Sequence, residues 1–208
     1  MSNTAETPTL NVAILVYDNA EVLDFSGPFE VFSVTTLPDG SVPFKVSLIA
    51  TKMREIQAIN GMKVVPNETI ETLPSPDILV IAGGSGSRQQ LDNTQLITWI
   101  QDVHKSAKLV MSVCSGANLL AVAGLLDGLN VTTHHQVVEY LKELAPKAVL
   151  CPQERFTDNG KIITSAGISA GIDASFYVVE KLLGTEVARQ TAVYMEYDWQ
   201  PAKQVVDV

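Results

Sequence analysis

The sequence predicts one α/β domain in which helices sandwich a doubly wound, mostly parallel sheet. Short apolar runs rich in β-branched residues, typical of strands covered on both faces, alternate with stretches whose apolar residues recur at helical spacing. A chain of 208 residues is long enough for one such domain with a full core. We therefore expect a single domain over residues 1–208, with flexible tails at 1–9 and 201–208.

Strands and helices are expected in alternation through the first half of the chain. The run 10–16, LNVAILV, is almost wholly apolar and predicts a central strand. Pro28 suits the first turn of a helix that continues to Val34, because its fixed φ and missing N–H are tolerated there. Further strands are expected at 44–50, 62–66 and 78–82, the second of these peripheral, and a helix at 92–106.

The second half continues the same pattern. The apolar run 108–113 predicts a buried strand, and 115–126 carries apolar residues at helical spacing. The pair Asn159-Gly160 lies between alternating segments, which predicts a β-hairpin over 155–165. Helices are also expected at 138–144, from Ser169 or Asp173 to Leu183 with Gly184 as C-cap, and at 186–197.

The composition indicates a soluble globular protein. Hydrophobic residues make up 46% of the chain and charged residues 18%. The net charge is -9 and the basic residues do not gather into a stripe, which argues against nucleic-acid binding. The polar start differs from a signal peptide, and no run approaches the roughly 20 apolar residues of a membrane span. We expect a cytoplasmic protein with neither nucleic acid nor membrane as partner.

The cysteines and histidines do not form a disulfide framework or a metal site in the sequence. Cys114 and Cys151 are the two cysteines, and they have no metal-ligand spacing with the three histidines. The adjacent His134 and His135 would point in different directions in any regular element, so a shared metal is not expected. We predict two reduced thiols, a structural or incidental role for Cys151, and no metal.

Cys114 marks a candidate nucleophile elbow. It joins the predicted strand 108–113 to the predicted helix 115–126, and the small residues beside it permit a tight corner. A thiol at a helix N-terminus faces unpaired backbone N–H groups, which lower a cysteine pKa from ~8.5 to a range of roughly 3.5 to 7.5. The alternative is a buried structural cysteine, a common fate of this residue type.

Other candidate groups follow the strands at their carboxyl ends. Asp24 is expected in the loop after the first strand, at the sheet edge where ligands bind, although a helix N-cap or first-turn position explains a carboxylate there as well. Gly83 and Gly84 follow another strand and suit either a tight turn or a close backbone approach. In the second case the backbone N–H of Gly84 and that of Ser115 would form an oxyanion hole.

Four motifs together resemble the ThiJ/PfpI superfamily over residues 10–200. They are LDFSGPFEVF at 23–32, ILVIAGG at 78–84, SVCSGANLLAVAGLLDGLNVTTHH at 112–135 and TSAGISAGID at 164–173. The resemblance implies the flavodoxin-like fold of class I glutamine amidotransferases. Within the superfamily, the LDxxGPxEVF pattern and the closing EYDWQP look most like isocyanide hydratases and the amidotransferase-like domain of AraC-type regulators.

The resemblance also implies a reaction and its residues. Cys114 matches the nucleophile, Asp24 the acidic residue that contacts its sulfur, and Ser115 the hydroxyl residue that follows. His134, Gly83 and Tyr17 are further candidates for the pocket. The implied reaction is hydration of an isocyanide to an N-substituted formamide by a hydro-lyase without a cofactor, with Asp24 as general acid and base.

Members of the superfamily are usually homodimers, and the helix that carries Phe29 and Phe32 is a candidate interface. Isocyanide hydratases usually have threonine where this chain has Ser115, and tryptophan where it has His135. The peptidase-like branch has histidine after the nucleophile, so Ser115 argues against a protease. A regulator would need a helix-turn-helix domain after Val208, and we expect none.

Two other uses of the same cysteine stay open. A glyoxalase or deglycase-like enzyme would use Cys114 and the acidic residue together with His134, and would convert methylglyoxal to lactate. A redox sensor would carry Cys114 as a peroxide-oxidised sulfinate and would turn over no substrate.

Overall fold

The computed structural model describes residues 9–73 and 75–201. Within these residues no helix is long and apolar enough to cross a membrane. The tails predicted at 1–9 and 201–208 lie outside the described residues, apart from Thr9 and Pro201.

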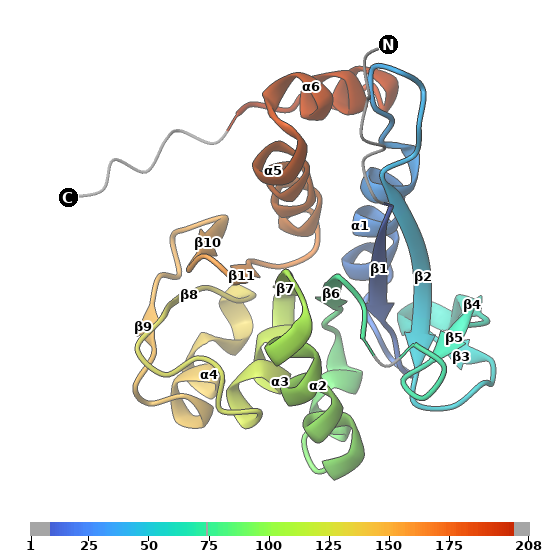
Figure 1. The fold of residues 1–208 in the computed structure, drawn as a ribbon. Coiled ribbons are helices and arrows are strands. Elements are labelled where there is room, and N and C mark those ends of the chain that lie inside the picture. The colour runs from blue at the N-terminus through green and yellow to red at the C-terminus, as the bar shows by residue number, and fades with distance from the viewer. Residues whose placement is uncertain (1–8, 74, 202–208) are drawn as a thin grey trace.

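A seven-stranded sheet forms the centre of the molecule (Figure 1). Its strand order is β10-β11-β7-β6-β1-β2-β5, and every neighbouring pair is parallel except the β10–β11 hairpin. The mostly parallel sheet and the hairpin are as predicted. The strands are β1 (Leu10–Leu15), β2 (Phe44–Ala50), β5 (Glu68–Thr69), β6 (Ile78–Ile81), β7 (Leu109–Val113), β10 (Phe156–Asp158) and β11 (Ile162–Ser165).

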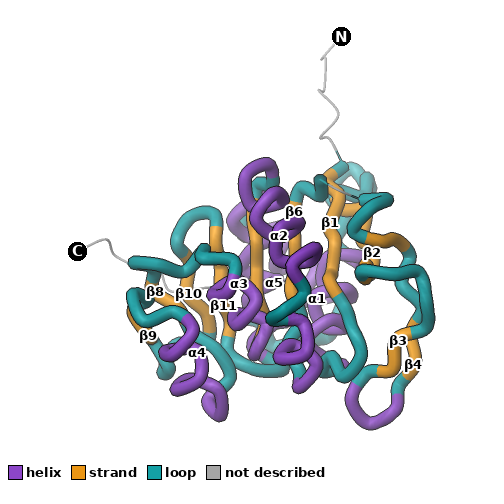
Figure 2. Tube along the Cα trace, turned by 90° about the horizontal axis from the view of Figure 1, so that it is seen from below, coloured by secondary structure: helices purple, strands orange, loops and turns teal. Residues whose placement is uncertain are grey.

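Two small two-stranded sheets lie at opposite ends of the main sheet (Figure 2). One pairs β3 (Ile56–Gln57) with β4 (Lys63–Val64) in antiparallel register, and β4 is the peripheral strand expected at 62–66. The other pairs β8 (Asn130–Val131) with β9 (Val149–Leu150) in parallel register.

Helices cover both faces of the sheet (Figures 1 and 2). On one side α5 packs against both α1 and α6, and on the other α3 packs against α2 and α4. Short 3₁₀ turns lie at 59–61, 85–90, 114–116 and 135–137. The helices are α1 (Val22–Val34), α2 (Thr94–Ser106), α3 (Ala117–Val122), α4 (Val138–Leu144), α5 (Ala170–Leu183) and α6 (Thr185–Tyr194).

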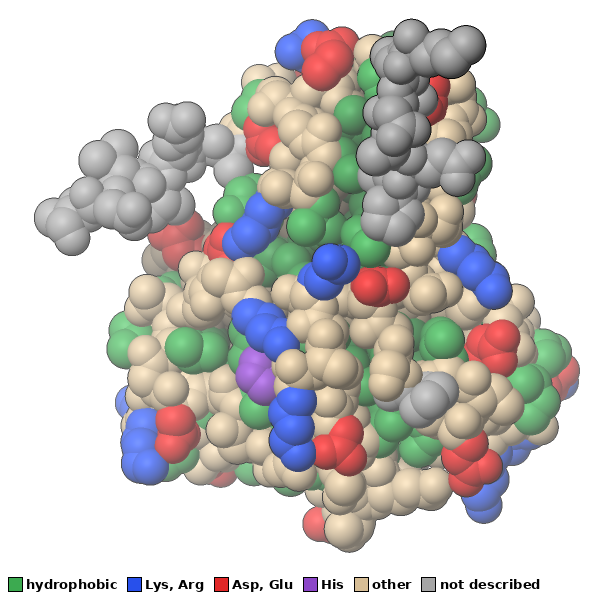
Figure 3. Space-filling model, in the orientation of Figure 1, with side chains coloured by type: hydrophobic (Ala, Val, Ile, Leu, Met, Phe, Trp, Pro, Cys, Tyr) green, Lys and Arg blue, Asp and Glu red, His purple; other side chains and the backbone are tan. Residues whose placement is uncertain are grey.

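The core explains the continuous apolar runs of the sequence. All residues of β6 and β7 are buried, as central strands between two helix layers require. Phe32 is fully buried and meets Phe44 edge to face, with ring centroids 5.2 Å apart. Phe32 therefore packs inside its own chain, while the helix that carries Phe29 and Phe32 stays a predicted interface. The surface, in contrast, is mixed in charge: on the face shown in Figure 3, acidic side chains lie among the basic ones.

Helix α1 begins at Val22, six residues before the start that Pro28 suggested. Asp24 consequently lies in the first turn of the helix and not in the preceding loop, which corrects the sequence-based placement. Pro28 sits inside the helix and cannot donate to the Asp24 carbonyl four residues back, a cost that burial of this part of α1 offsets.

Two predicted helices are also shorter than expected. The helix after the elbow ends at Val122, because the chain turns at Gly124 with φ +72°. Helix α6 ends at Tyr194 and not near Tyr197. The Tyr197 hydroxyl donates instead to Asp173 Oδ1 at 2.8 Å, which ties the following segment to α5.

Candidate active site

The strand-to-helix corner at Cys114 is a nucleophile elbow, as predicted. Strand β7 ends at Val113, a 3₁₀ turn covers Cys114–Gly116, and α3 follows at Ala117. Cys114 has φ +56°, a left-handed conformation that is uncommon outside glycine and that persists only where its surroundings enforce it. Its side chain is 8% exposed and contributes to the wall of a cavity.

Three hydrogen bonds hold the strained Cys114 backbone, one of them from the Ala117 N–H to the Cys114 carbonyl oxygen. The buried Thr133 Oγ1 donates to the Cys114 carbonyl oxygen at 2.7 Å, and the Cys114 N–H donates to the Ala166 carbonyl at 3.2 Å. Thr133 lies inside a motif quoted above, yet no role was predicted for it, because a threonine in such a motif can equally be a plain core residue.

Replacing Thr133 with valine is expected to lower the free energy of unfolding by about 0.5–1.5 kcal/mol, since the buried Cys114 carbonyl keeps the Ala117 N–H but loses its side-chain donor. The elbow should relax, and alkylation of Cys114 by iodoacetamide should slow. Thr132→Val is the matched control, because the buried Thr132 hydroxyl donates to the Glu154 carbonyl and not to the elbow. Urea unfolding and alkylation rates measure both effects. Equal alkylation rates in the two variants would contradict this role of Thr133.

Asp24 is fully buried, and two backbone N–H groups hold its carboxylate. Gly83 donates to Oδ2 at 3.0 Å and Ile168 donates to Oδ1 at 3.1 Å. Ile168 has φ +58°, a strained conformation for a β-branched residue. Burial raises the pKa of Asp24 to about 7, and the nearby Glu21 charge adds to this, while the two N–H groups and the Cys114 side chain oppose it.

Burial also raises the pKa of the Cys114 thiol to about 12, and the Asp24 charge adds to the rise. The backbone N–H groups of Ser115 and Gly84 favour the thiolate, as the elbow predicted, but burial outweighs them. The expectation of a lowered Cys114 pKa is therefore wrong. The sequence could show that the N–H groups were near, but not that a buried carboxylate lay beside the sulfur.

The absence of a side chain at Gly83 lets the loop after β6 pack closely against Asp24, Cys114 and Ser115. A Cβ on Gly83 would lie 2.7 Å from Asp24 Oδ2 and 2.7 Å from the Ser115 nitrogen. Gly84 has φ +98°, which favours glycine. The Gly83 N–H is bonded to Asp24, so of these two N–H groups it is that of Gly84 that favours the Cys114 thiolate.

Ser115 is fixed by a small hydroxyl network. Its Oγ donates to the Gly84 carbonyl at 3.0 Å and accepts from the buried Ser87 Oγ at 3.1 Å. Ser87 was not among the predicted site residues. Its position directly after the glycine-rich loop 83–86 is the one feature of the sequence that could have pointed to it. The network links the loop after β6 to the elbow after β7.

A cavity of about 490 Å³ opens in front of Cys114, within the size range of small-molecule sites. His134 and His135 both line it with ring centroids 4.2 Å apart, so the expectation that they point apart is wrong. They lie at the start of a 3₁₀ turn and not within a regular helix or strand. The lining residues are Glu21, Ile59, Gly84, Ser85, Ser87, Arg88, Cys114, Ser115, His134, His135, Gln136, Val137 and Ile168.

The histidines have defined surroundings. Burial lowers the pKa of His134, and the neighbouring His135 adds to this. The Gln136 N–H donates to His134 Nδ1 at 3.3 Å, which places the proton of a neutral ring on Nε2. Within the described residues no group of three or more His, Cys, Asp or Glu side chains could hold a metal ion.

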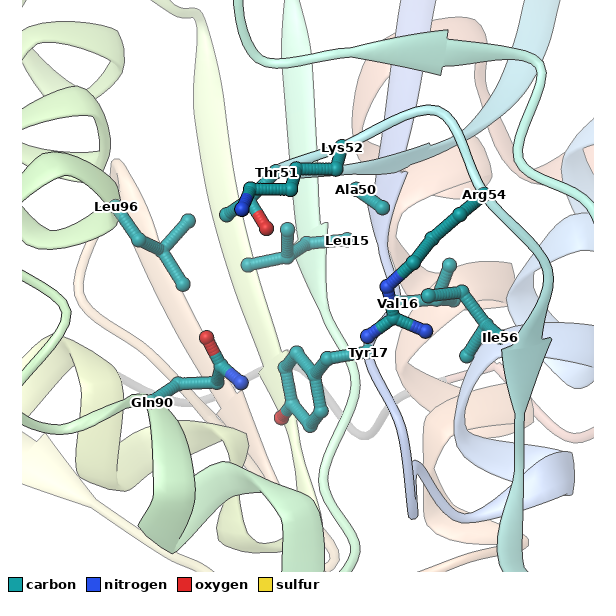
Figure 4. Close-up of a pocket in the computed structure, with 10 residues that line it drawn as sticks. All are labelled: Leu15, Val16, Tyr17, Ala50, Thr51, Lys52, Arg54, Ile56, Gln90 and Leu96. Atoms are coloured by element: carbon teal, nitrogen blue, oxygen red, sulfur yellow. The ribbon is translucent and has the colours of Figure 1, made fainter.

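Tyr17, a predicted pocket residue, is not among the described residues that line the Cys114 cavity. It lines a separate cavity of about 30 Å³, shown in Figure 4 between residues of β1, the loop after β2 and Gln90. Its hydroxyl donates to the Ala82 carbonyl, and burial raises its pKa well above the usual value. Tyr17 thus binds the backbone just after β6 through its hydroxyl group, outside the Cys114 cavity.

Comparisons with known proteins show which family the chain belongs to. The family model described as "DJ-1/PfpI family" matches residues 10–181. The chain is 29% identical over 188 residues to an isonitrile hydratase of Pseudomonas putida, covering 90% of this chain and 78% of that protein. It is 21% identical to the HTH-type transcriptional regulator GbdR of Pseudomonas aeruginosa, and spans about half of that regulator's length.

A solved structure has the same fold. The crystal structure of a ThiJ/PfpI family protein from Pseudomonas syringae superposes with a TM-score of 0.82 at 26% identity, covering 99% of this chain and 82% of that one. The family model covers well over half of the chain and includes β1, Asp24, the glycine-rich loop and the elbow. On this evidence the chain belongs to the DJ-1/PfpI family.

Proposed function

We propose that the protein hydrates an isocyanide, R–NC, to the N-substituted formamide R–NH–CHO. The observation that carries the proposal is the buried Asp24 carboxyl group, which two backbone N–H groups hold beside the Cys114 thiol at the wall of a cavity. A nucleophile and a proton carrier in contact are what addition across an isocyanide carbon requires. The similarity to an isonitrile hydratase supports the same reaction.

The first step uses one proton shared by Cys114 and Asp24. In the reactive form the sulfur is a thiolate and Asp24 is protonated. The sulfur attacks the terminal carbon of R–NC, and Asp24 gives its proton to that carbon. A C–S and a C–H bond form, the carbon–nitrogen bond becomes a double bond, and a thioimidate R–N=CH–S remains beside ionised Asp24.

The second step adds water. Asp24 takes a proton from a water molecule whose oxygen bonds to the imidate carbon, and the N–H groups of Gly84 and Ser115 stabilise the developing charge. The nitrogen gains the hydroxyl proton through solvent, the C=O bond forms, and the C–S bond breaks. The formamide leaves, and the pair returns to a thiolate with protonated Asp24.

The test is a spectrophotometric assay of the purified protein with 4-nitrophenyl isocyanide, with the formamide identified by mass. Turnover to the formamide supports the proposal, and the absence of turnover with aryl and alkyl isocyanides would contradict it. Methylglyoxal is assayed beside it, because conversion to lactate would favour the glyoxalase-like alternative.

The pH dependence follows from the shared proton. Asp24 has a pKa of about 7, so below this pH both members of the pair carry a proton and no thiolate is available. Above it one proton remains on the pair. It lies mainly on the sulfur, whose pKa is raised to about 12, and its transfer to Asp24 gives the reactive thiolate. We expect kcat/KM to rise with pH through about 7 and then to level. A profile that falls through pH 7 would contradict the one-proton form as the reactive state.

A further inference from the structure

Arg88 lines the Cys114 cavity from the 3₁₀ turn 85–90. Its guanidinium carbon lies 4.6 Å from the ring centroid of Tyr140 in α4. Stacking on an aromatic face orients the planar group and leaves its N–H donors at the edge of the plane free to bind. The Tyr140 ring of α4 therefore holds the Arg88 guanidinium at the wall of the cavity.

Arg88 differs from the other arginines of the chain. Arg54 pairs with Asp18, Arg155 with Asp173 and Arg189 with Glu186. Among the described residues Arg88 has no acidic partner. In a protein of net charge -9, a guanidinium without an acidic partner that lines a cavity is a candidate binding group for an anion.

The remaining polar groups of the cavity are compatible with this role. Glu21, the acidic side chain that lines it, is the N-cap of α1 and so lies at the Asp24 end. Apolar side chains of Ile59, Val137 and Ile168 also line the space. Charges farther away than the Debye length, about 8 Å at physiological salt, are largely screened. The Arg88 guanidinium therefore sets the sign of the electrostatic potential in the part of the cavity beside it.

We propose that the substrate is an isocyanide whose substituent carries a carboxylate, bound by Arg88 while the isocyanide carbon meets Cys114. This inference rests on the hydration reaction proposed above. A carboxylate accepts two parallel N–H bonds from a guanidinium, which selects both its charge and its direction. The apolar side chains would contact the part of the substituent between the two ends.

The experiment compares substrates that differ in one charge. The initial rates of 4-isocyanobenzoate and its methyl ester, and of 3-isocyanopropanoate and its methyl ester, are measured with the wild-type protein. We expect kcat/KM to favour the acid by about 10- to 100-fold in at least one series. Arg88→Gln should lower kcat/KM for the acid by at least about tenfold more than for the ester and so abolish this preference, and Arg88→Lys should keep part of it. Arg189→Gln, which removes a surface arginine of α6 paired with Glu186, is the control and should change neither substrate.

A wild-type protein that prefers the ester in both series, or an acid preference that survives in Arg88→Gln, would overturn the inference. If no isocyanide is turned over, the hydration proposal fails and binding decides the role of Arg88. Calorimetry then measures the affinity of Cys114→Ala for 4-formamidobenzoate and its methyl ester. Tighter binding of the acid that is lost on adding Arg88→Gln supports an anion-binding Arg88, and equal affinities sink it.

Discussion

Replacing Cys114 with alanine is expected to lower kcat/KM for isocyanide hydration by at least about 10,000-fold, because Cys114 is the one thiol among the described residues that line the cavity. The fold should persist, since alanine removes only the sulfur from a corner whose backbone is held by Thr133 and Ala166. Product formation and far-ultraviolet circular dichroism measure the two quantities.

Cys151→Ala is the matched control for that variant. Cys151 is a free thiol at the end of β9, outside the residues that line the cavity, and its loss should leave kcat/KM unchanged. Measurable hydration by Cys114→Ala at a rate near that of the wild type would remove Cys114 from the reaction.

The second large effect is expected for Asp24→Asn, with a loss of about 100- to 10,000-fold in kcat/KM, the usual contribution of a general acid and base. Asparagine cannot give a proton to the isocyanide carbon. It also removes the negative charge that adds to the pKa of Cys114, so the thiol pKa should fall. Hydration should therefore be lost while alkylation of Cys114 by iodoacetamide at pH 8 becomes faster.

If the hydration rate falls while the alkylation rate rises, Asp24→Asn has removed the proton carrier and left the elbow intact. Damage to the elbow would lower both rates. Glu30→Gln removes an exposed carboxylate from the same helix and should alter neither rate. If Asp24→Asn slows both reactions to the same degree, the variant has disturbed the cysteine itself and Asp24 is not assigned as the proton carrier.

The central architecture could be predicted because it depends on local patterns. The strands β1, β6 and β7 are wholly or almost wholly apolar runs, and the corner at Cys114 follows from a strand, a cysteine and small neighbours. The candidate roles of Asp24 and Ser115 came from the resemblance, and the structure brings both side chains to the cysteine.

The contacts that decide the chemistry join segments far apart in the chain. Ile168 donates to Asp24 across 144 positions, and a β-branched residue with positive φ leaves no signal in the sequence. The rise of the Cys114 pKa depends on burial beside Asp24, which no local pattern reports. In the same way, the contact between Arg88 and Tyr140 of α4 joins residues that no local pattern connects.

Intact-protein mass spectrometry after an acid quench tests covalent attack by Cys114 most directly. Wild-type protein mixed for milliseconds with excess 4-nitrophenyl isocyanide should gain the mass of one isocyanide, and peptide mapping should place it on Cys114. The adduct should be absent from Cys114→Ala and should decay as the formamide appears. Formamide production without an adduct on Cys114 at any time point, in a protein whose Cys114→Ala variant also turns over, would contradict the mechanism.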